Sequence, residues 1–155
     1  GPEPVLRGVD DVLQRVNDRG APFVTCCYAT LDTRTGALAW SSAGHPPPLL
    51  VRADGEDRFG TTEPGPPLAT VPRSRYETAS AQLAPADLLV LYTDGLVERR
   101  GEIIDRGLER LRTQVRDRPT TGSEDIARYL ADLVHDPVDD IAVLCAQRSH
   151  QDRST

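Results

Sequence analysis

Prolines and glycines interrupt this chain so often that long helices have little room to form. The 155 residues include 13 prolines and 12 glycines. The sharpest interruption is the run Gly44-His45-Pro46-Pro47-Pro48, where successive prolines remove backbone donors and exclude regular structure. Most apolar segments between such breaks have the length of a strand. The pattern therefore argues against a coiled coil or a helical bundle.

The order of the apolar segments predicts an α+β fold. Apolar residues at helical spacing predict a first helix from Pro4 to Arg19, and about seven short strands follow it. The clearest strands are expected at 23–31, 37–42, 49–52, 57–59, 76–83 and 88–92. The strand at 23–31 is apolar on both faces and is expected to be central in its sheet. Two helices and a last strand at 141–146 complete the order, with Ser123 as the expected N-cap of the second of these helices.

Strands followed by helices are typical of domains in which helices cover a mainly antiparallel sheet or sandwich. The length corresponds to one domain, or to one large piece of a bigger domain. We expect residues 1–148 to form this unit and residues 149–155 to be a disordered tail.

Charge and apolar patterning limit the partners. The formal net charge is −6, all basic residues are arginine, and aromatic residues make up only 5% of the chain. Nucleic-acid binding calls for basic stripes and stacking surfaces, so no nucleic acid is expected. No apolar stretch approaches the ~18 residues of a membrane span, and no signal peptide is visible, so no membrane partner is expected either.

The three cysteines do not predict a disulfide. Cys26 and Cys27 are neighbours, Cys145 is distant, and no C-x-x-C spacing occurs. All three lie in apolar, strand-like runs, where cysteine behaves as a small buried hydrophobe. The pattern favours a reducing, cytoplasmic location.

Acidic residues flank the two most apolar strands. Asp94 follows the strand that ends at Tyr92, and Asp139 and Asp140 precede the strand that begins at Ile141. If these strands are antiparallel neighbours or lie on facing sheets, three carboxylates gather at one edge, where a Mg²⁺ or Mn²⁺ ion would neutralise them. Gly95 would let backbone approach the ion without a Cβ. The alternative is that Asp94-Gly95 is an ordinary turn and that Asp139-Asp140 is merely solvated.

Other chemistries find less support. The segment 91–95 is similar to the nucleophile loop of haloacid-dehalogenase-like phosphatases, but Tyr92 stands where the nucleophilic carboxylate is needed. His45 could be a general acid or a ligand, although a histidine in such a rigid loop more often braces it through a hydrogen bond. Ser41-Ser42 has no nucleophile-elbow motif, and His135 and His150 carry no partner signature.

Three ordered motifs carry a family resemblance that covers nearly the whole chain. They are Ala43-Gly44-His45-Pro46-Pro47-Pro48-Leu49-Leu50, Leu88-Leu89-Val90-Leu91-Tyr92-Thr93-Asp94-Gly95-Leu96-Val97-Glu98 and Asp139-Asp140-Ile141-Ala142-Val143-Leu144. The sequence resembles the SpoIIE/RsbU branch of the type-2C, metal-dependent serine/threonine phosphatases. The resemblance implies an α+β antiparallel β-sandwich with flanking helices and two Mn²⁺ or Mg²⁺ ions at one edge.

The resemblance also implies roles for residues. Asp94 and Asp139 would be metal ligands, with Gly95 and Asp140 as further ligands or as residues just behind the ligands, and His45 in an active-site loop. Hydrolysis would use metal-activated water and no protein nucleophile. The substrate would be phosphoserine or phosphothreonine on a regulatory protein, typically an anti-sigma-factor antagonist, and an upstream sensor or regulatory domain would control the reaction.

Two departures from the family pattern bear on this reading. The family's Gly-Asp-Val-x-Gly loop, which supplies another metal-binding aspartate, has no counterpart here, and Asp10-Asp11 lacks the glycines to replace it. The usual Pro-Leu-Gly turn reads Pro67-Leu68-Ala69. We therefore expect the chain to be the C-terminal two-thirds of a phosphatase domain, with its N-terminal portion missing, weak Mn²⁺ binding, poor turnover by itself, and open sheet edges that favour a homodimer.

Two alternatives to the enzyme remain. One is a non-catalytic, phosphatase-like module that binds a partner without chemistry. The other is a plain structural domain in which the aspartates only form turns.

Overall fold

The structure is a computed structural model that describes residues 1–16, 24–61, 63, 65–117, 122–134 and 139–149. The chain forms two compact units, and the sequence passes from one to the other and back. The first unit comprises Gly1–Pro47 and Gly60–Gln82, and the second comprises Pro48–Phe59 and Leu83–Thr155. No helix in the described ranges combines the length and apolarity that crossing a bilayer requires.

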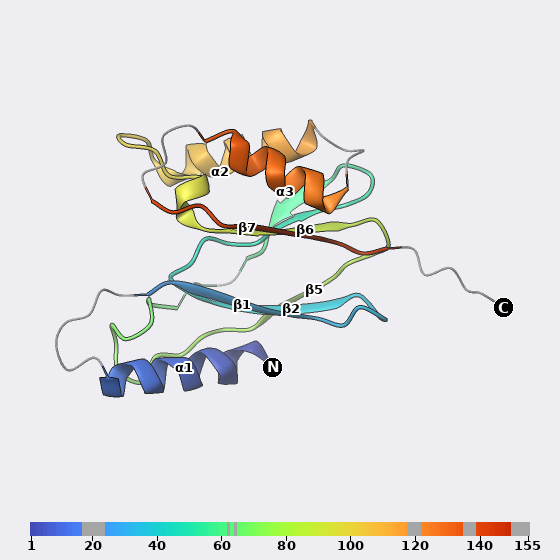
Figure 1. Ribbon diagram of the computed structural model, residues 1–155. Helices are drawn as coiled ribbons and strands as arrows, with labels where there is room; N and C mark the ends of the chain where they lie inside the picture. The colour runs from blue at the N-terminus through green and yellow to red at the C-terminus, as the bar shows by residue number, and fades with distance from the viewer. Residues whose placement is uncertain (17–23, 62, 64, 118–121, 135–138, 150–155) are drawn as a thin grey trace. The chain divides into compact units, whose positions relative to one another are not determined.

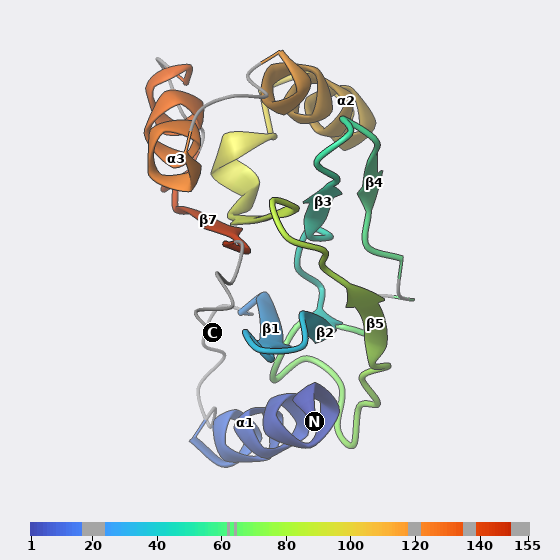
Figure 2. The ribbon, with the colours of Figure 1, turned by 90° about the vertical axis from the view of Figure 1, so that its right-hand side faces the viewer.

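The first unit is an antiparallel sheet with one helix packed on it. Helix α1 (Pro2–Val16) lies along the sheet formed by β1 (Cys26–Leu31), β2 (Ala37–Ala43) and β5 (Ala79–Gln82), in the order β1-β2-β5 (Figures 1 and 2). The hairpin predicted between the first two strands is present, with Cys26 opposite Ala43 and Leu31 opposite Leu38. An Asp32 turn closes it, since the Asp32 carboxylate accepts hydrogen bonds from the amides of Arg34 and Thr35.

One side of α1 is buried and a neighbouring stripe is exposed. Leu6 packs with Ala43, Leu68 and Tyr76 in the core of this unit. The exposed stripe consists of valines at helical spacing: Val5, Val9, Val12 and Val16.

Helix α1 also buries a carboxylate. Asp10 is 1% exposed and accepts a hydrogen bond of 2.7 Å from the amide of Ala69. Ala69 has a φ of 64°, in the left-handed region that favours glycine. Asp10 therefore fixes a turn whose backbone conformation suits the glycine of the family pattern better than the alanine found here.

The second unit is a four-stranded antiparallel sheet with two long helices. The strands follow the order β4-β3-β6-β7. Their bounds are β3 (Leu49–Val51), β4 (Asp57–Phe59), β6 (Leu88–Tyr92) and β7 (Val143–Gln147). A short 3-10 helix, η1 (Asp94–Leu96), follows β6, and α2 (Ile104–Arg116) and α3 (Ser123–Asp132) lie on the sheet (Figure 1).

The core of this unit lies between the sheet and the helices. Residues from β3, β6, η1, α2 and α3 form one apolar cluster, which includes Leu49, Val90, Leu96, Leu111 and Leu130. Ion pairs join α2 to the edge strand β4. Arg112 and Arg116 of α2 both bind the carboxylate of Asp57, whose side chain is 4% exposed.

Three predictions about the elements are wrong in detail. Strand β1 is an edge strand of its sheet among the described strands, and its Tyr28 is exposed. Ser123 is the first residue of α3, and Gly122 is its N-cap. The first helix begins at Pro2 instead of Pro4, and its predicted end at Arg19 lies outside the described residues. Residues 17–23 and the tail from 150 lie outside the described residues.

The left-handed conformation of Ala69 leads to a stability prediction. Ala69→Gly should raise the free energy of unfolding by about 0.5–1 kcal/mol, because glycine adopts a positive φ without steric cost. Urea denaturation of the two proteins measures the difference. The control Ala81→Gly, in the middle of β5, should lower the free energy of unfolding by about the same amount. A loss of stability at both positions would contradict the argument.

Candidate functional site

The pairing of β6 with β7 brings the two predicted acidic segments together. The strands are antiparallel, and Tyr92 at the end of β6 lies opposite Val143 at the start of β7 (Figure 1). The residues that follow β6 and those that precede β7 therefore occupy the same edge of the sheet. This is the antiparallel neighbour arrangement that the sequence left as one of its alternatives.

Thr93 bonds the two segments directly. Its amide donates to the carbonyl of Ala142 over 3.0 Å, and its hydroxyl accepts from the amide of Ala142 over 2.8 Å. The same hydroxyl donates to the carbonyl of Asp140 over 2.9 Å. The residue before Asp94 is thus fixed to the backbone that carries Asp140.

Gly95, the residue after Asp94, packs against the backbone of Asp139 and Asp140. A Cβ at Gly95 would lie 2.6 Å from the carbonyl oxygen of Asp139 and 2.7 Å from that of Asp140. Such distances are too short for a side chain, so only glycine fits without a shift of the backbone. Asp94 is therefore flanked on both sides by residues in contact with the 139–142 segment.

The aspartates differ in how they are held. Asp94 begins η1 and is half-buried, and its carbonyl accepts hydrogen bonds from Val97 and Glu98 at 2.8 and 2.7 Å. Asp139 and Asp140 are exposed, and the Asp139 carboxylate accepts a 2.7 Å hydrogen bond from the Asp140 amide. Within the described ranges, no three His, Cys, Asp or Glu side chains are grouped to hold one metal ion, so the expected gathering of three carboxylates is not found.

The chemistry of this edge suits a hard divalent cation. Its donors are carboxylate and carbonyl oxygens, the ligand type that Mg²⁺ and Mn²⁺ take. The space beside Gly95 lies next to two carbonyl oxygens and would be filled by any Cβ. Asp94, Asp139 and Asp140 are the acidic residues at this edge.

Helix α2 supports the turn from behind. A Cβ at Gly107 would lie 1.9 Å from the carbonyl oxygen of Val97, so the helix backbone rests directly on the end of the Asp94 turn. Arg110 also donates to this carbonyl over 3.0 Å and pairs with Glu102 at 2.7 Å. Sequence reasoning missed Thr93, Gly107 and Arg110 as supporting residues. A glycine inside an otherwise helical pattern was the one available signal.

His45 has the contacts of a loop brace. Its Nδ1 lies 3.0 Å from the hydroxyl of Thr25, and its backbone amide and carbonyl both bond to the hydroxyl of Ser42 at 3.2 and 2.9 Å. These contacts match the bracing role weighed from the sequence. His45 belongs to the first unit and Asp94 to the second. His135 and His150 lie outside the described residues.

The cysteines are poor nucleophiles. All three are free, as expected, but they are half-buried and not fully buried. Burial raises the pKa of Cys27 and of Cys145 to about 11, and it also raises the pKa of Cys26. Because the thiolate is the reactive form, these thiols are unreactive at neutral pH.

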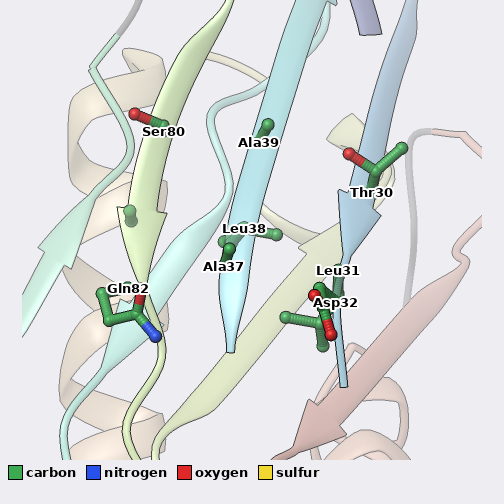
Figure 3. A pocket seen from close by; sticks show the side chains of 9 residues that line it. Thr30, Leu31, Asp32, Ala37, Leu38, Ala39, Ser80 and Gln82 are labelled. Atoms are coloured by element: carbon green, nitrogen blue, oxygen red, sulfur yellow. The ribbon is translucent and has the colours of Figure 1, made fainter. Parts of the chain in front are cut away.

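A shallow hollow at one end of the β1-β2-β5 sheet offers no catalytic groups. It is lined by residues of the three strands and the first residue of the hairpin turn (Figure 3): Thr30, Leu31, Asp32, Ala37, Leu38, Ala39, Ser80, Ala81 and Gln82. Asp32 is its one charged residue, and hydrogen bonds from the Thr35 amide and hydroxyl and from the Arg34 amide lower the pKa of its carboxyl. That carboxylate is already used to hold the hairpin turn.

Comparisons with known proteins identify the family of this chain. The family model described as Stage II sporulation protein E (SpoIIE) matches residues 1–149. The chain belongs to the SpoIIE family. It is homologous to phosphatase domains of the SpoIIE/RsbU type, as the three motifs predicted.

Two solved structures and one curated protein illustrate the likeness. A structure of the RsbU and RsbW domains of Rv1364c from Mycobacterium tuberculosis matches with a TM-score of 0.77 and 28% identity, over 94% of this chain and 41% of that one. The SpoIIE phosphatase domain from Bacillus subtilis (Mn presoaked) matches with a TM-score of 0.66 and 18% identity, over 83% and 58% of the two chains. Protein IcfG from Synechocystis is 28% identical over 96 residues, which are 61% of this chain and 15% of IcfG.

These matches confirm the predicted fold class, an α+β arrangement of antiparallel sheets and helices like that of type-2C phosphatase domains. The chain spans well under two thirds of these relatives, from 15% of IcfG to 58% of the SpoIIE phosphatase domain. The boundary expected at residue 148 stays a prediction.

The contact beneath the Asp94 turn gives a matched pair of predictions. Gly107→Ala should lower the free energy of unfolding by about 1–3 kcal/mol, because the new methyl group overlaps the Val97 carbonyl. In Gly8→Ala, in α1, no atom lies within 4 Å of the new Cβ, so this change should raise the free energy of unfolding by about 0.5–1 kcal/mol. Chemical denaturation measures both. Similar effects of the two changes would contradict the packing of α2 on the turn.

The buried thiols give a second prediction. At pH 8, iodoacetamide should alkylate Cys27 and Cys145 on the order of 100-fold more slowly in the native protein than in guanidinium-unfolded protein, because the thiolate is scarce at a pKa of about 11. The native rate should rise steadily between pH 8 and 11. Rapid labelling of either residue in the folded protein at pH 8, followed by mass spectrometry, would contradict the burial of these side chains.

Proposed function

We propose that this chain is the metal-dependent serine/threonine phosphatase domain, or a large part of it, of a regulatory protein. Membership of the SpoIIE family supports phosphatase chemistry in general. The observation that carries the proposal is local: Thr93 and Gly95, on either side of Asp94, both contact the backbone of the Asp139–Asp140 segment. Two acidic segments, far apart in the sequence, thereby supply oxygen donors to one place.

Mn²⁺ or Mg²⁺ is the proposed cofactor. Asp94 and Asp139 would hold the metal, with Asp140 and the backbone around Gly95 behind them. Relatives support this choice, since one structure is of RsbX in complex with magnesium and another is of a SpoIIE phosphatase domain presoaked with Mn. When bound, such ions lower the pKa of water and clamp phosphate oxygens, as in other metal-assisted hydrolases.

The residues of this chain then have positional tasks. Asp94 and Asp139 provide negative charge at the sheet edge, and Gly95 keeps the space beside the Asp139 and Asp140 carbonyls free of side-chain atoms. The thiols are raised in pKa by burial, and Ser41 and Ser42 are buried in the first unit, so none of these groups is poised as a nucleophile. Direct attack by water fits this set of residues better than a covalent intermediate.

The proposed substrate is phosphoserine or phosphothreonine on a regulatory protein, with an anti-sigma-factor antagonist as the first candidate. RsbU and RsbW domains share one chain in the Mycobacterium tuberculosis relative, and another relative belongs to a bacterial stressosome structure. A cytoplasmic location, an upstream sensor or regulatory domain and a homodimer complete the proposal. They rest on the family resemblance.

The decisive experiment removes one carboxylate charge. In the full-length natural protein with Mn²⁺, Asp94→Asn should lower the hydrolysis of an aryl phosphate by on the order of 100-fold or more, because metal charge stabilisation is worth several kcal/mol. The control Asp132→Asn changes an exposed carboxylate at the end of α3 and should leave the rate unchanged. If the protein without any substitution shows no Mn²⁺-dependent hydrolysis, the proposed phosphatase activity is wrong.

A non-catalytic interaction module is the second candidate. It is favoured by the absence of a three-residue metal-binding group within the described ranges. This module would bind its partner equally well with and without Mn²⁺ and after Asp94→Asn. A pull-down or calorimetric titration with the same variants therefore separates the two functions.

A further inference from the structure

We propose that the Thr93 hydroxyl is a positioning group that sets the spacing between the Asp94 turn and the Asp139–Asp140 segment, and thereby the affinity of the candidate centre for a divalent cation. This inference rests on the proposed function for its consequence in metal binding. Its structural part, the bond between the two segments, stands on the contacts of Thr93.

The hydroxyl is used in both of its hydrogen-bonding capacities. Its oxygen accepts from the Ala142 amide at 2.8 Å, and its one proton is donated to the Asp140 carbonyl at 2.9 Å. The Ala142 carbonyl, at 3.5 Å from the hydroxyl, is too far to compete and already accepts from the Thr93 amide at 3.0 Å. A hydroxyl can donate to one of these groups and accept from the other, whereas the methyl group that replaces it in valine can do neither.

These bonds extend the pairing of the strands past its regular end. The ladder between β6 and β7 ends at Tyr92 and Val143. Beyond it the chain turns sharply into η1, and the Asp139–Asp140 segment makes no further strand pairing with it. The side chain of Thr93 replaces the missing ladder bonds, so the two segments stay together at the point where the acidic residues begin.

Loss of these hydrogen bonds would change the positions of the acidic groups. Asp94 follows Thr93 directly, and Asp139 precedes the Asp140 carbonyl that the hydroxyl holds. Without the hydroxyl, the backbone bond from Thr93 to Ala142 and the packing of Gly95 remain, but the Asp140 carbonyl loses the hydrogen bond that holds it to the turn. Groups that orient metal ligands in this way typically affect metal affinity by about 10- to 100-fold when removed.

The test compares two side chains of nearly the same shape. Thr93→Val removes the hydroxyl and keeps the branched shape, whereas Thr93→Ser keeps the hydroxyl and removes a methyl group. Thr113→Val is the matched control, because the Thr113 hydroxyl donates to the Glu109 carbonyl one turn earlier in α2, away from the acidic segments. Mn²⁺ binding to the full-length protein is measured by the electron paramagnetic resonance of free Mn²⁺, and amide hydrogen exchange is followed in peptides that contain Ala142.

The expected result is a metal-specific defect with rescue by serine. Thr93→Val should weaken Mn²⁺ binding by about tenfold or more and raise by a similar factor the Mn²⁺ concentration that gives half-maximal hydrolysis, with most of kcat recovered at saturating Mn²⁺. Exchange at the Ala142 amide should become faster. Thr93→Ser and Thr113→Val should resemble the unchanged protein in all of these measurements.

Different results refute different statements. If the protein without substitutions binds Mn²⁺ and Thr93→Val binds it equally tightly, the positioning role of Thr93 is refuted and the proposed function stands. If the protein without substitutions neither binds Mn²⁺ nor hydrolyses the aryl phosphate, the proposed function is refuted, and so is the effect of Thr93 on metal affinity. In that case, faster exchange at Ala142 in Thr93→Val, restored by serine, would still support the bond between the segments, and unchanged exchange would refute it.

Discussion

The antiparallel register between β6 and β7 is the constraint on which the candidate site depends. Leu88, Val90 and Tyr92 lie on one face of β6 and belong to the apolar cluster shared with α2 and α3. A slip of one residue would turn this apolar set to the opposite face of the sheet, so burial fixes the register. Once Tyr92 lies opposite Val143, the segments that carry Asp94 and Asp139 must meet. The hydrophobic core of the second unit thus decides where polar groups gather.

The site is held together mainly by backbone groups. Gly95 rests on the carbonyls of Asp139 and Asp140, and Gly107 rests on the carbonyl of Val97, each at a distance that excludes any side chain. The side chains of Thr93 and Arg110 also bond to carbonyls, those of Asp140 and Val97. Carbonyl positions vary little with rotamer, because they are fixed by the chain itself. A turn held in this way presents Asp94 from a rigid support, which suits the role of metal ligand proposed for it.

Sequence patterns predicted best where burial and turn chemistry agree. The strand 88–92 has the expected bounds, and the hairpin turn lies at 32–36 as expected, because a continuous apolar run and an aspartate turn act locally. Periodicity could not reveal that β1 lies at a sheet edge, because an apolar strand can be covered by a helix on one face without a neighbour along its edge. Thr93 was missed as a supporting residue for a similar reason: its partners are backbone groups distant in sequence, which leave no spacing pattern.

Coordination chemistry sets how many carboxylate side chains a bound ion needs from the protein. Mg²⁺ usually keeps several waters and takes only one or two carboxylates from the protein. The proposed pair, Asp94 and Asp139, has the number of carboxylates that one such ion takes, although no three acidic, histidine or cysteine side chains are grouped within the described ranges. Two ions would divide the same carboxylates between them and leave each with fewer protein ligands. A second ion consequently demands oxygen donors beyond the edge formed by the Asp94 turn and the Asp139–Asp140 segment.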